Sequence, residues 1–242
     1  MIRHNTPRTD RPRIAVLTLV SGEHDHLLSH VDGLSVSTWP PDIHVVTSIR
    51  DRAVARGRLP ICSDRWTTVV PVLPVPRSRD AFLPRLHVAG RTALEGGADV
   101  LIFLSVSCIP SRRLLQVLAQ AAVRGQSATP TLWHSAVDGL GAAPAVGYLV
   151  AGDLDALLAD PTDTSGPTGV SARRWCSSFA MTARDWGLVL PRAHTAHPYD
   201  GAPTAVEDVI IASSGRIRQV TGATAYLQHT ALRQKLPAPA TA

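Results

Sequence analysis

The stretch from residue 99 to residue 110, Asp-Val-Leu-Ile-Phe-Leu-Ser-Val-Ser-Cys-Ile-Pro, constrains the fold more than any other part of the chain. Its apolar run, residues 100–104, has no polar residue at alternate positions, which is typical of a strand covered on both faces of a sheet. Pro110 has no amide hydrogen, so we expect the strand ladder not to continue past it. The stretch therefore predicts a buried strand that delivers Ser105 and Ser107 to a sheet edge, where ligands of open α/β sheets bind.

The first fifty residues contain the pattern of a strand, a helix and a second strand. Residues 14–20 are almost entirely apolar, which predicts a buried strand, and Ser21 and Gly22 predict a turn after it. Apolar residues then recur at helical spacing over residues 27–34. A second strand, expected over residues 43–49, completes a βαβ unit.

The same alternation continues along the chain. A short strand interrupted by prolines is expected within residues 67–76, and a helix is expected to follow it to about Gly97. After the central strand, apolar residues between Leu114 and Ala122 line one face of another helix. This order predicts an α/β fold with a doubly wound, mostly parallel central sheet flanked by helices.

Length and composition indicate one domain with a proper core, since the chain has 242 residues of which 45% are hydrophobic and 18% charged. We expect a disordered arm at residues 1–12, the domain at residues 13–232 and a flexible tail at residues 233–242. Residues 152–171, rich in Gly, Asp, Pro, Thr and Ser, are expected to form a mobile loop within that domain.

Several classes of protein are disfavoured. The sequence has no apolar run long enough to span a membrane and no signal-peptide pattern at its start, so we expect a cytoplasmic protein. The three cysteines show no pairing pattern and are expected to be small core residues. The net charge is +5, but the arginines are scattered and aromatic residues make up 5%, so nucleic acid is not expected as a partner. Motifs of hydrolases, ATPases and dehydrogenases are absent.

Several segments between residues 13 and 230 resemble the family 2 glycosyltransferases. The similar segments are residues 16–27, residues 40–46, the central strand at 99–110, residues 175–181 followed by Trp186, the pair Glu207 and Asp208, and residues 226–229. The resemblance implies a single GT-A-like domain that transfers a sugar from a nucleotide-sugar donor to an acceptor hydroxyl. The sugar, the nucleobase, the acceptor and the oligomeric state stay open.

The resemblance also assigns roles to individual residues. Ser21 and Gly22 lie in the nucleotide-facing loop, and Asp51 is the nearest candidate for the acidic residue that contacts the nucleobase. His229 stands where a histidine approaches the metal or the diphosphate. Asp208, beside Glu207, stands where an aspartate serves as general base.

The chain departs from the family's pattern at the metal site. Ser105 and Ser107 replace both aspartates of the Asp-x-Asp motif that holds a divalent metal on the diphosphate, and a hydroxyl is a poor ligand for magnesium or manganese. A requirement for a divalent metal is therefore doubtful. Residues 86–89 lack the usual Arg-Asn-x-Gly, and residues 190–194 replace the usual Gly-Gly-Phe-Asp-Glu.

These departures leave three functions open. The first is sugar transfer with Asp208 as general base and with weakened or absent dependence on a metal, and the second is a non-catalytic protein that keeps the fold as a binding or interaction module. The third is metal-independent transfer in which His229, Arg112 or Arg113 neutralises the phosphates.

Some of the singled-out residues also have purely structural interpretations. Glu207 and Asp208 are favourable acids for the first turn of a helix, and Ser105 and Ser107 can satisfy backbone groups in a turn. Histidines 24, 26 and 30 have a spacing compatible with metal binding, but we expect them to be solvated. The aromatic side chains of Trp175, Phe179 and Trp186 are expected in the core.

Overall fold

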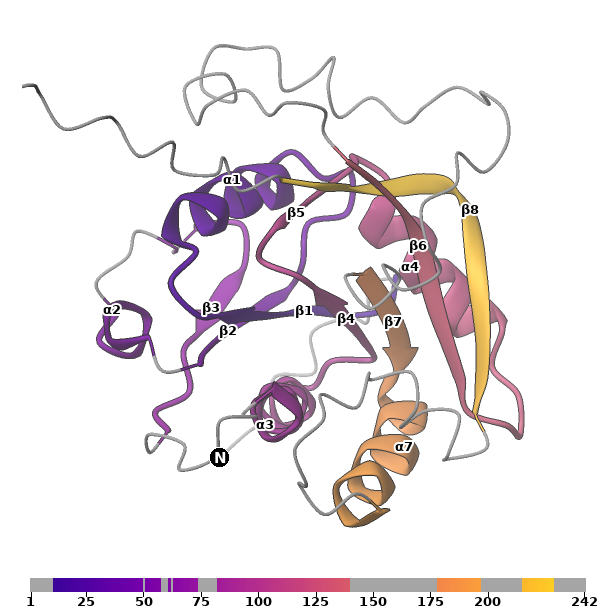
Figure 1. Ribbon diagram of the computed structural model, residues 1–242. Coiled ribbons are helices and arrows are strands. Elements are labelled where there is room, and N and C mark those ends of the chain that lie inside the picture. Colours follow the sequence, from indigo (N-terminus) through magenta and orange to yellow (C-terminus); the bar gives the residue numbers. More distant parts are fainter. Residues whose placement is uncertain are drawn as a thin grey trace, which may run out of the picture.

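A mixed, eight-stranded sheet organises the computed structural model, which describes residues 11–49, 51–57, 61, 63–73, 82–139, 178–196 and 215–228. The strands are β1 (Ile14–Val20), β2 (Ile43–Ser48), β3 (Thr67–Val69), β4 (Val100–Leu104), β5 (Cys108–Pro110), β6 (Thr131–Gly139), β7 (Ser178–Thr182) and β8 (Arg216–Leu227). The helices are α1 (His24–Ser35), α2 (Arg52–Ala55), α3 (Phe82–Glu95), α4 (Leu114–Arg124) and α7 (Ala183–Ala196). In the sheet, the strands follow the order β3-β2-β1-β4-β7-β6-β8-β5 (Figure 1).

The first half of the sheet is parallel. Strand β1 pairs in parallel with β2 on one side and with β4 on the other, and β3 extends the sheet beyond β2. Every residue of β1 and of β4 is buried, as the continuous apolar runs predict. Because the chain builds outward from β1 through β2 to β3 and then returns to the other side of β1, the sheet has a topological switch point between β1 and β4.

The second half of the sheet is mixed. Strand β7 runs antiparallel to β4 and to β6, whereas β6 runs parallel to β8. The α/β fold class and the flanking helices are thus confirmed, and the predominance of parallel pairing is confined to the first half.

The strand ladder stops at Pro110, as predicted, but Pro110 does not close the central strand. The central strand β4 already ends at Leu104, and Pro110 belongs to the short edge strand β5, where it lies opposite Ala225 of β8. An edge strand tolerates proline because one of its sides needs no amide donor.

Helices cover both faces of the sheet (Figure 1). On one face, α3 and α7 enclose a core that includes Phe103, Phe179 and Trp186, so the expected core positions of the latter two are confirmed. A Cβ at Gly90 would collide with the Trp186 indole, which shows how closely α3 and α7 approach. On the other face, α1 and α4 pack on alternate residues of the same strands. Within the described residues, no helix is both long and apolar enough to cross a membrane.

The remaining structural expectations concern the cysteines, the N-terminal arm and the domain boundaries, and only some of these residues are described. Cys108 is buried, as expected, whereas Cys62, Trp175 and Cys176 lie outside the described residues. Arg11, placed at the end of the expected N-terminal arm, donates from Nη2 to Oδ1 of Asp42 over 2.9 Å. The domain boundaries and the mobile loop stay predictions, since residues 1–10, 140–177 and 229–242 are not among the described residues.

Candidate functional site

The loops that follow β1, β2 and β4 lie at one edge of the sheet, because these strands are parallel neighbours. They carry Ser21, Gly22, Asp51, Ser105 and Ser107, which the sequence singles out as cofactor-binding residues. A small apolar cluster lies beneath them and consists of Val20, Leu27, Val46, Val54, Ile61 and Val106. The edge is therefore polar at its surface and apolar below.

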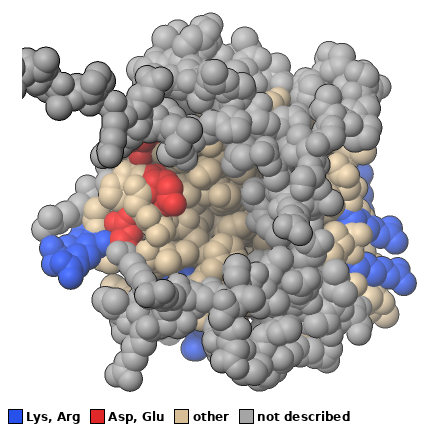
Figure 2. Space-filling model, in the orientation of Figure 1, with Lys and Arg blue, Asp and Glu red and all other residues tan. Residues whose placement is uncertain are grey.

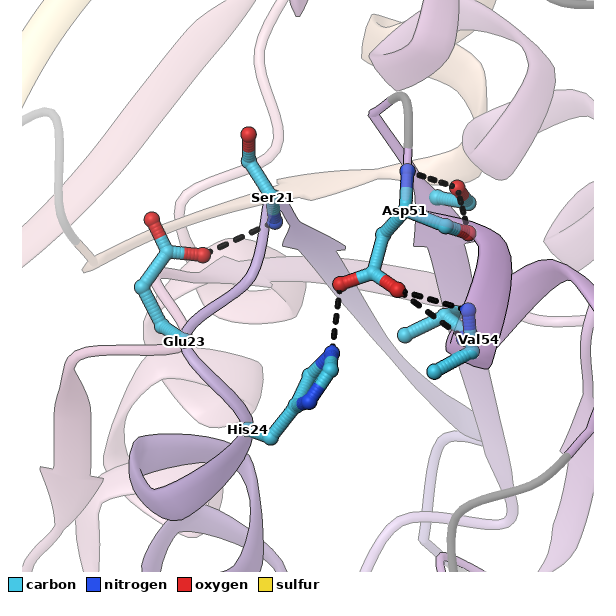
Figure 3. Close-up of polar contacts among 7 residues, drawn as sticks. Ser21, Glu23, His24, Asp51 and Val54 are labelled. Carbon is cyan, nitrogen blue, oxygen red and sulfur yellow. Dashed lines mark hydrogen bonds and ion pairs between the residues drawn. The ribbon is translucent and has the colours of Figure 1, made fainter.

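The short loop between β1 and α1 is held by a hydrogen bond between two of its own residues, Ser21 and Glu23. Gly22 has a φ of +105°, a conformation that residues with a side chain rarely adopt. The backbone N–H of Ser21 donates to Oε2 of Glu23 over 2.8 Å (Figure 3). This short loop places the first turn of α1, with His24 and His26, beside the ends of β2 and β4.

The carboxylate of Asp51 contacts three hydrogen-bonding groups, two from α2 and one from His24 (Figure 3). One oxygen accepts the backbone N–H groups of Ala53 and Val54 over 2.9 and 3.1 Å and so caps α2, and the other lies 2.6 Å from Nε2 of His24. Burial by itself would raise the pKa of Asp51, but the hydrogen bonds from Val54, His24 and Ala53 outweigh it and lower the pKa. Asp51 is therefore an ionised carboxylate, and its side chain is only 4% exposed, against 37% for that of His24.

The turn after β4 is held by contacts from α1 and from the end of β8. The ring nitrogen Nδ1 of His26 lies 3.1 Å from Oγ of Ser107. The backbone N–H of Gln228 donates to the carbonyl of Ser107 over 2.7 Å, and its side-chain amide donates to the carbonyl of His26 over 3.2 Å. Within the turn, the N–H of Ser107 donates to Oγ of Ser105 over 3.4 Å, so Ser105 has the structural role that the sequence left open for it.

A chain of fully buried polar groups lies under α1. Oγ1 of Thr18 lies 3.1 Å from Nε2 of both His30 and His44, and Nδ1 of His30 donates to the carbonyl of Cys108 over 2.7 Å. Burial lowers the pKa of His30 to about 4 and holds that of His44 well below its ordinary value, with the neighbouring His30 contributing to the latter shift. Both imidazoles are therefore neutral at pH 7.

The expectation that the three histidines of α1 are solvated is wrong for His30 and holds in part for His24 and His26. His30 is buried against the sheet, while His24 and His26 are half-buried and each binds the end of a neighbouring strand. One signal in the sequence indicated the buried hydrogen-bonded group of Thr18, His30 and His44, namely the polar residues Thr18 and His44 inside otherwise apolar strands. The contacts of His24, His26 and Gln228 have no such local signal.

Of the other candidate residues, only Arg112 and Arg113 lie within the described structure, and their backbone lies away from this edge. Glu207, Asp208 and His229 lie outside the described residues. The carbonyl of Arg112 accepts the N–H of Thr38, just beyond the C-terminal end of α1, and Arg113 follows it. A helix of 12 residues is about 18 Å long, so the structure places the backbone of these two arginines far from the first turn of α1.

The sequence matches no protein-family model and no curated protein sequence. Its structure is similar to that of Staphylococcus aureus TarS, residues 1–349, with a TM-score of 0.55 and 12% identity over 89% of this chain and 60% of that one. It is also similar to the mannosyltransferase PcManGT of Pyrobaculum calidifontis in complex with GDP-Man and Mn²⁺, with a TM-score of 0.54 and 13% identity over 93% of this chain and 59% of that one. A cytidylyltransferase of Leptospira borgpetersenii has a TM-score of 0.52 and 9% identity over 87% of this chain and 76% of that one.

These similarities establish the fold. The chain spans about 60% of the length of the TarS and PcManGT structures. At such low identity the likeness extends to architecture and not to individual activities. The described chain therefore has the GT-A-like fold found in nucleotide-sugar transferases.

Proposed function

We propose that the protein binds a nucleotide sugar at the edge formed by β1, β2 and β4 and transfers the sugar to an acceptor hydroxyl, as a divergent member of the family 2 glycosyltransferases. One observation carries this proposal: in a GT-A-like fold, the polar loops of three parallel strands meet at the topological switch point. Two structures of similar fold are complexes with the nucleotide sugars GDP-Man and UDP-GlcNAc, which supports such a donor.

The proposal assigns a role to each candidate residue. Ser21 and Gly22 face the nucleotide, Asp51 lies on the nucleobase side, and the Ser105–Ser107 turn and His229 lie on the diphosphate side. Asp208, with Glu207 beside it, takes the proton of the acceptor hydroxyl. The hydroxyl oxygen then forms a bond to the anomeric carbon, and the bond from that carbon to the diphosphate oxygen breaks, so that the nucleoside diphosphate leaves with the bonding electron pair.

The described residues do not fit a divalent metal. Serine hydroxyls replace the expected carboxylates, and that of Ser107 already interacts with His26. Across the residues that the structure describes, no group of three or more His, Cys, Asp or Glu side chains is arranged to hold a metal. We therefore assign no step of the reaction to a metal.

Thermal unfolding of the purified protein against a panel of nucleoside diphosphates and nucleotide sugars, followed by a transfer assay, tests the proposal. A ligand at about 100 times its dissociation constant raises the free energy of unfolding by about 2.7 kcal/mol. We expect stabilisation by a nucleotide sugar, and transfer that is lost in Asp208→Asn while binding is kept. The absence of any stabilisation across the panel would refute the proposal.

A non-catalytic binding module is the second candidate, and the serines at positions 105 and 107 favour it. It predicts stabilisation by the same ligands without transfer to any acceptor. Transfer that depends on Asp208 would exclude it.

A further inference from the structure

One ring nitrogen of His26 is held by a contact within the protein, and the other ring nitrogen can bind a ligand. Nδ1 lies 3.1 Å from Oγ of Ser107, and within the described structure no hydrogen-bond partner contacts Nε2. The side chain is half-buried, as is that of Ser107. An imidazole held by one nitrogen keeps its orientation, and the other nitrogen is then the atom that meets a ligand.

The contact between His26 and Ser107 bridges the switch point. His26 belongs to the first turn of α1, which follows β1, and Ser107 lies in the turn that follows β4. The contact therefore joins the carboxyl ends of the two strands on either side of the topological switch point. This is the place where open α/β sheets bind their ligands. Gln228 fixes the backbone of both residues from a third strand.

The neighbouring carboxylates are not available for a cation at this point. Asp51 lies on the β2 side and is bound by His24 and by two backbone N–H groups, and Oε2 of Glu23 accepts the N–H of Ser21. The groups that face the ends of both β1 and β4 are an imidazole and a hydroxyl. A protonated imidazole donates from both ring nitrogens, from Nδ1 to Oγ of Ser107 and from Nε2 to a phosphate oxygen. The hydroxyl proton of Ser107 is then available for a second phosphate oxygen.

We propose that His26 and Ser107 bind the diphosphate of a nucleoside diphosphate directly, without a divalent metal. This inference rests on the proposed function and specifies how its donor is held. Exposed acids on the same side of the molecule oppose the binding of an anion: Glu23 and Asp25 are exposed, and acidic side chains gather near α1 and α2 (Figure 2). Moderate affinity is therefore expected, with the two donors fixing the position of the diphosphate.

Titration calorimetry with uridine diphosphate and guanosine diphosphate as probes, in EDTA and in manganese, tests the inference on the full chain. We expect one of them to bind equally well in both buffers. His26→Ala is expected to weaken that binding by about tenfold or more, because a hydrogen bond to a charged group is lost. His134→Ala, which removes a histidine of β6 bonded to the carbonyl of Ser135, is the matched control and should leave the affinity unchanged.

Two further variants distinguish the loss of a hydrogen-bond donor from a folding defect in His26→Ala. His26→Gln keeps one N–H donor and is expected to recover part of the affinity lost in His26→Ala. Ser107→Asp places a carboxylate beside the imidazole and the phosphates, so we expect it to abolish binding in EDTA.

The outcomes test the role of His26 and Ser107 separately from the proposed function. Binding in EDTA that depends on His26 supports the inference. Binding that requires manganese, or that is unchanged in His26→Ala, overturns the inference and leaves the proposed function standing. Where neither probe binds, the nucleotide that stabilises the protein in the thermal panel becomes the probe, and the absence of stabilisation by any of them overturns the proposed function itself.

Discussion

Two regions along α1 use the same residue type in opposite ways. Midway along the helix, His30 is fully buried, and the hydroxyl of Thr18 joins its Nε2 atom to that of His44 inside the protein. In the first turn, His24 and His26 are half-buried, and each binds one partner at the end of a strand. The buried histidines fix where α1 lies on the sheet, whereas the first-turn histidines arrange the edge at which we propose that the donor binds.

Acid should affect the buried pair most strongly. The pKa of each buried imidazole is lower in the folded than in the unfolded protein, so their contribution to stability is complete above about pH 6.5 and is lost as the pH falls toward their folded pKa values, about 4 for His30. The slope is about 1.4 kcal/mol per pH unit for each imidazole that is protonated only in the unfolded protein, which is roughly 2 kcal/mol for His30 between pH 6.5 and pH 5.

Urea unfolding at pH 7, 6 and 5 measures this slope. Asp51, whose pKa is lowered, loses its contribution only below its ordinary pKa of 3.8, so it does not interfere in this range. The variant His30→Gln should reduce the slope by about half. A free energy of unfolding that does not change between pH 7 and pH 5 would contradict the difference between the two regions.

Two threonines of the sheet allow a matched test of the buried chain. Thr18→Val removes the hydroxyl between the two imidazoles and leaves buried ring nitrogens unsatisfied, which should destabilise the protein by about 2 kcal/mol. Thr47 is equally buried, but its hydroxyl has no partner among the described residues, so Thr47→Val should be neutral or slightly stabilising. Equal effects of the two substitutions on urea unfolding would show that the buried chain contributes nothing.

The first-turn histidine His24 should contribute less to stability. His24→Ala removes the hydrogen bond to Asp51, in which the imidazole is 37% exposed. Because solvent screens such a pair and the backbone N–H groups still satisfy Asp51, we expect a loss of about 1 kcal/mol or less. A loss as large as that of Thr18→Val would remove the distinction between the buried and the first-turn histidines.

The smallest expected effect concerns the charge at the edge. Asp25→Asn removes an exposed carboxylate from the first turn of α1 and should strengthen binding of the nucleoside diphosphate about twofold at low salt. Asp32→Asn, near the other end of the same helix, is the control and should have no effect. The measurement is the dissociation constant by calorimetry in EDTA, and weaker binding in Asp25→Asn would contradict the expected repulsion.

The part of the fold that could be predicted from the sequence is the part fixed by local pattern. The structure confirms the strands predicted from the apolar runs (β1 and β4) and the helices predicted from helical spacing (α1 and α4). They could be predicted because burial on one or both faces of an element determines the spacing of its apolar residues. The apolar runs of β2 and β4 identified the loops that carry Asp51 and Ser107.

The contacts within the site could not be predicted in this way. His24 lies 27 residues from Asp51, and His26 lies 81 residues from Ser107. Such contacts depend on the register of β1 against β2 and β4, which no single segment encodes. The antiparallel pairings of β7 and the edge strand β5 also depend on distant partners.

The position of Gln228 has a consequence for the order in which the protein is assembled. Its side chain reaches the carbonyl of His26 across 202 residues of sequence, and its backbone closes the turn at Ser107. A growing chain can form β1, α1 and β4 long before this residue is made. The edge at which we propose that the donor binds is therefore expected to become fully ordered only after β8 has docked, late in synthesis. An incomplete chain would then hold the parallel half of the sheet without the contacts that Gln228 makes at this edge.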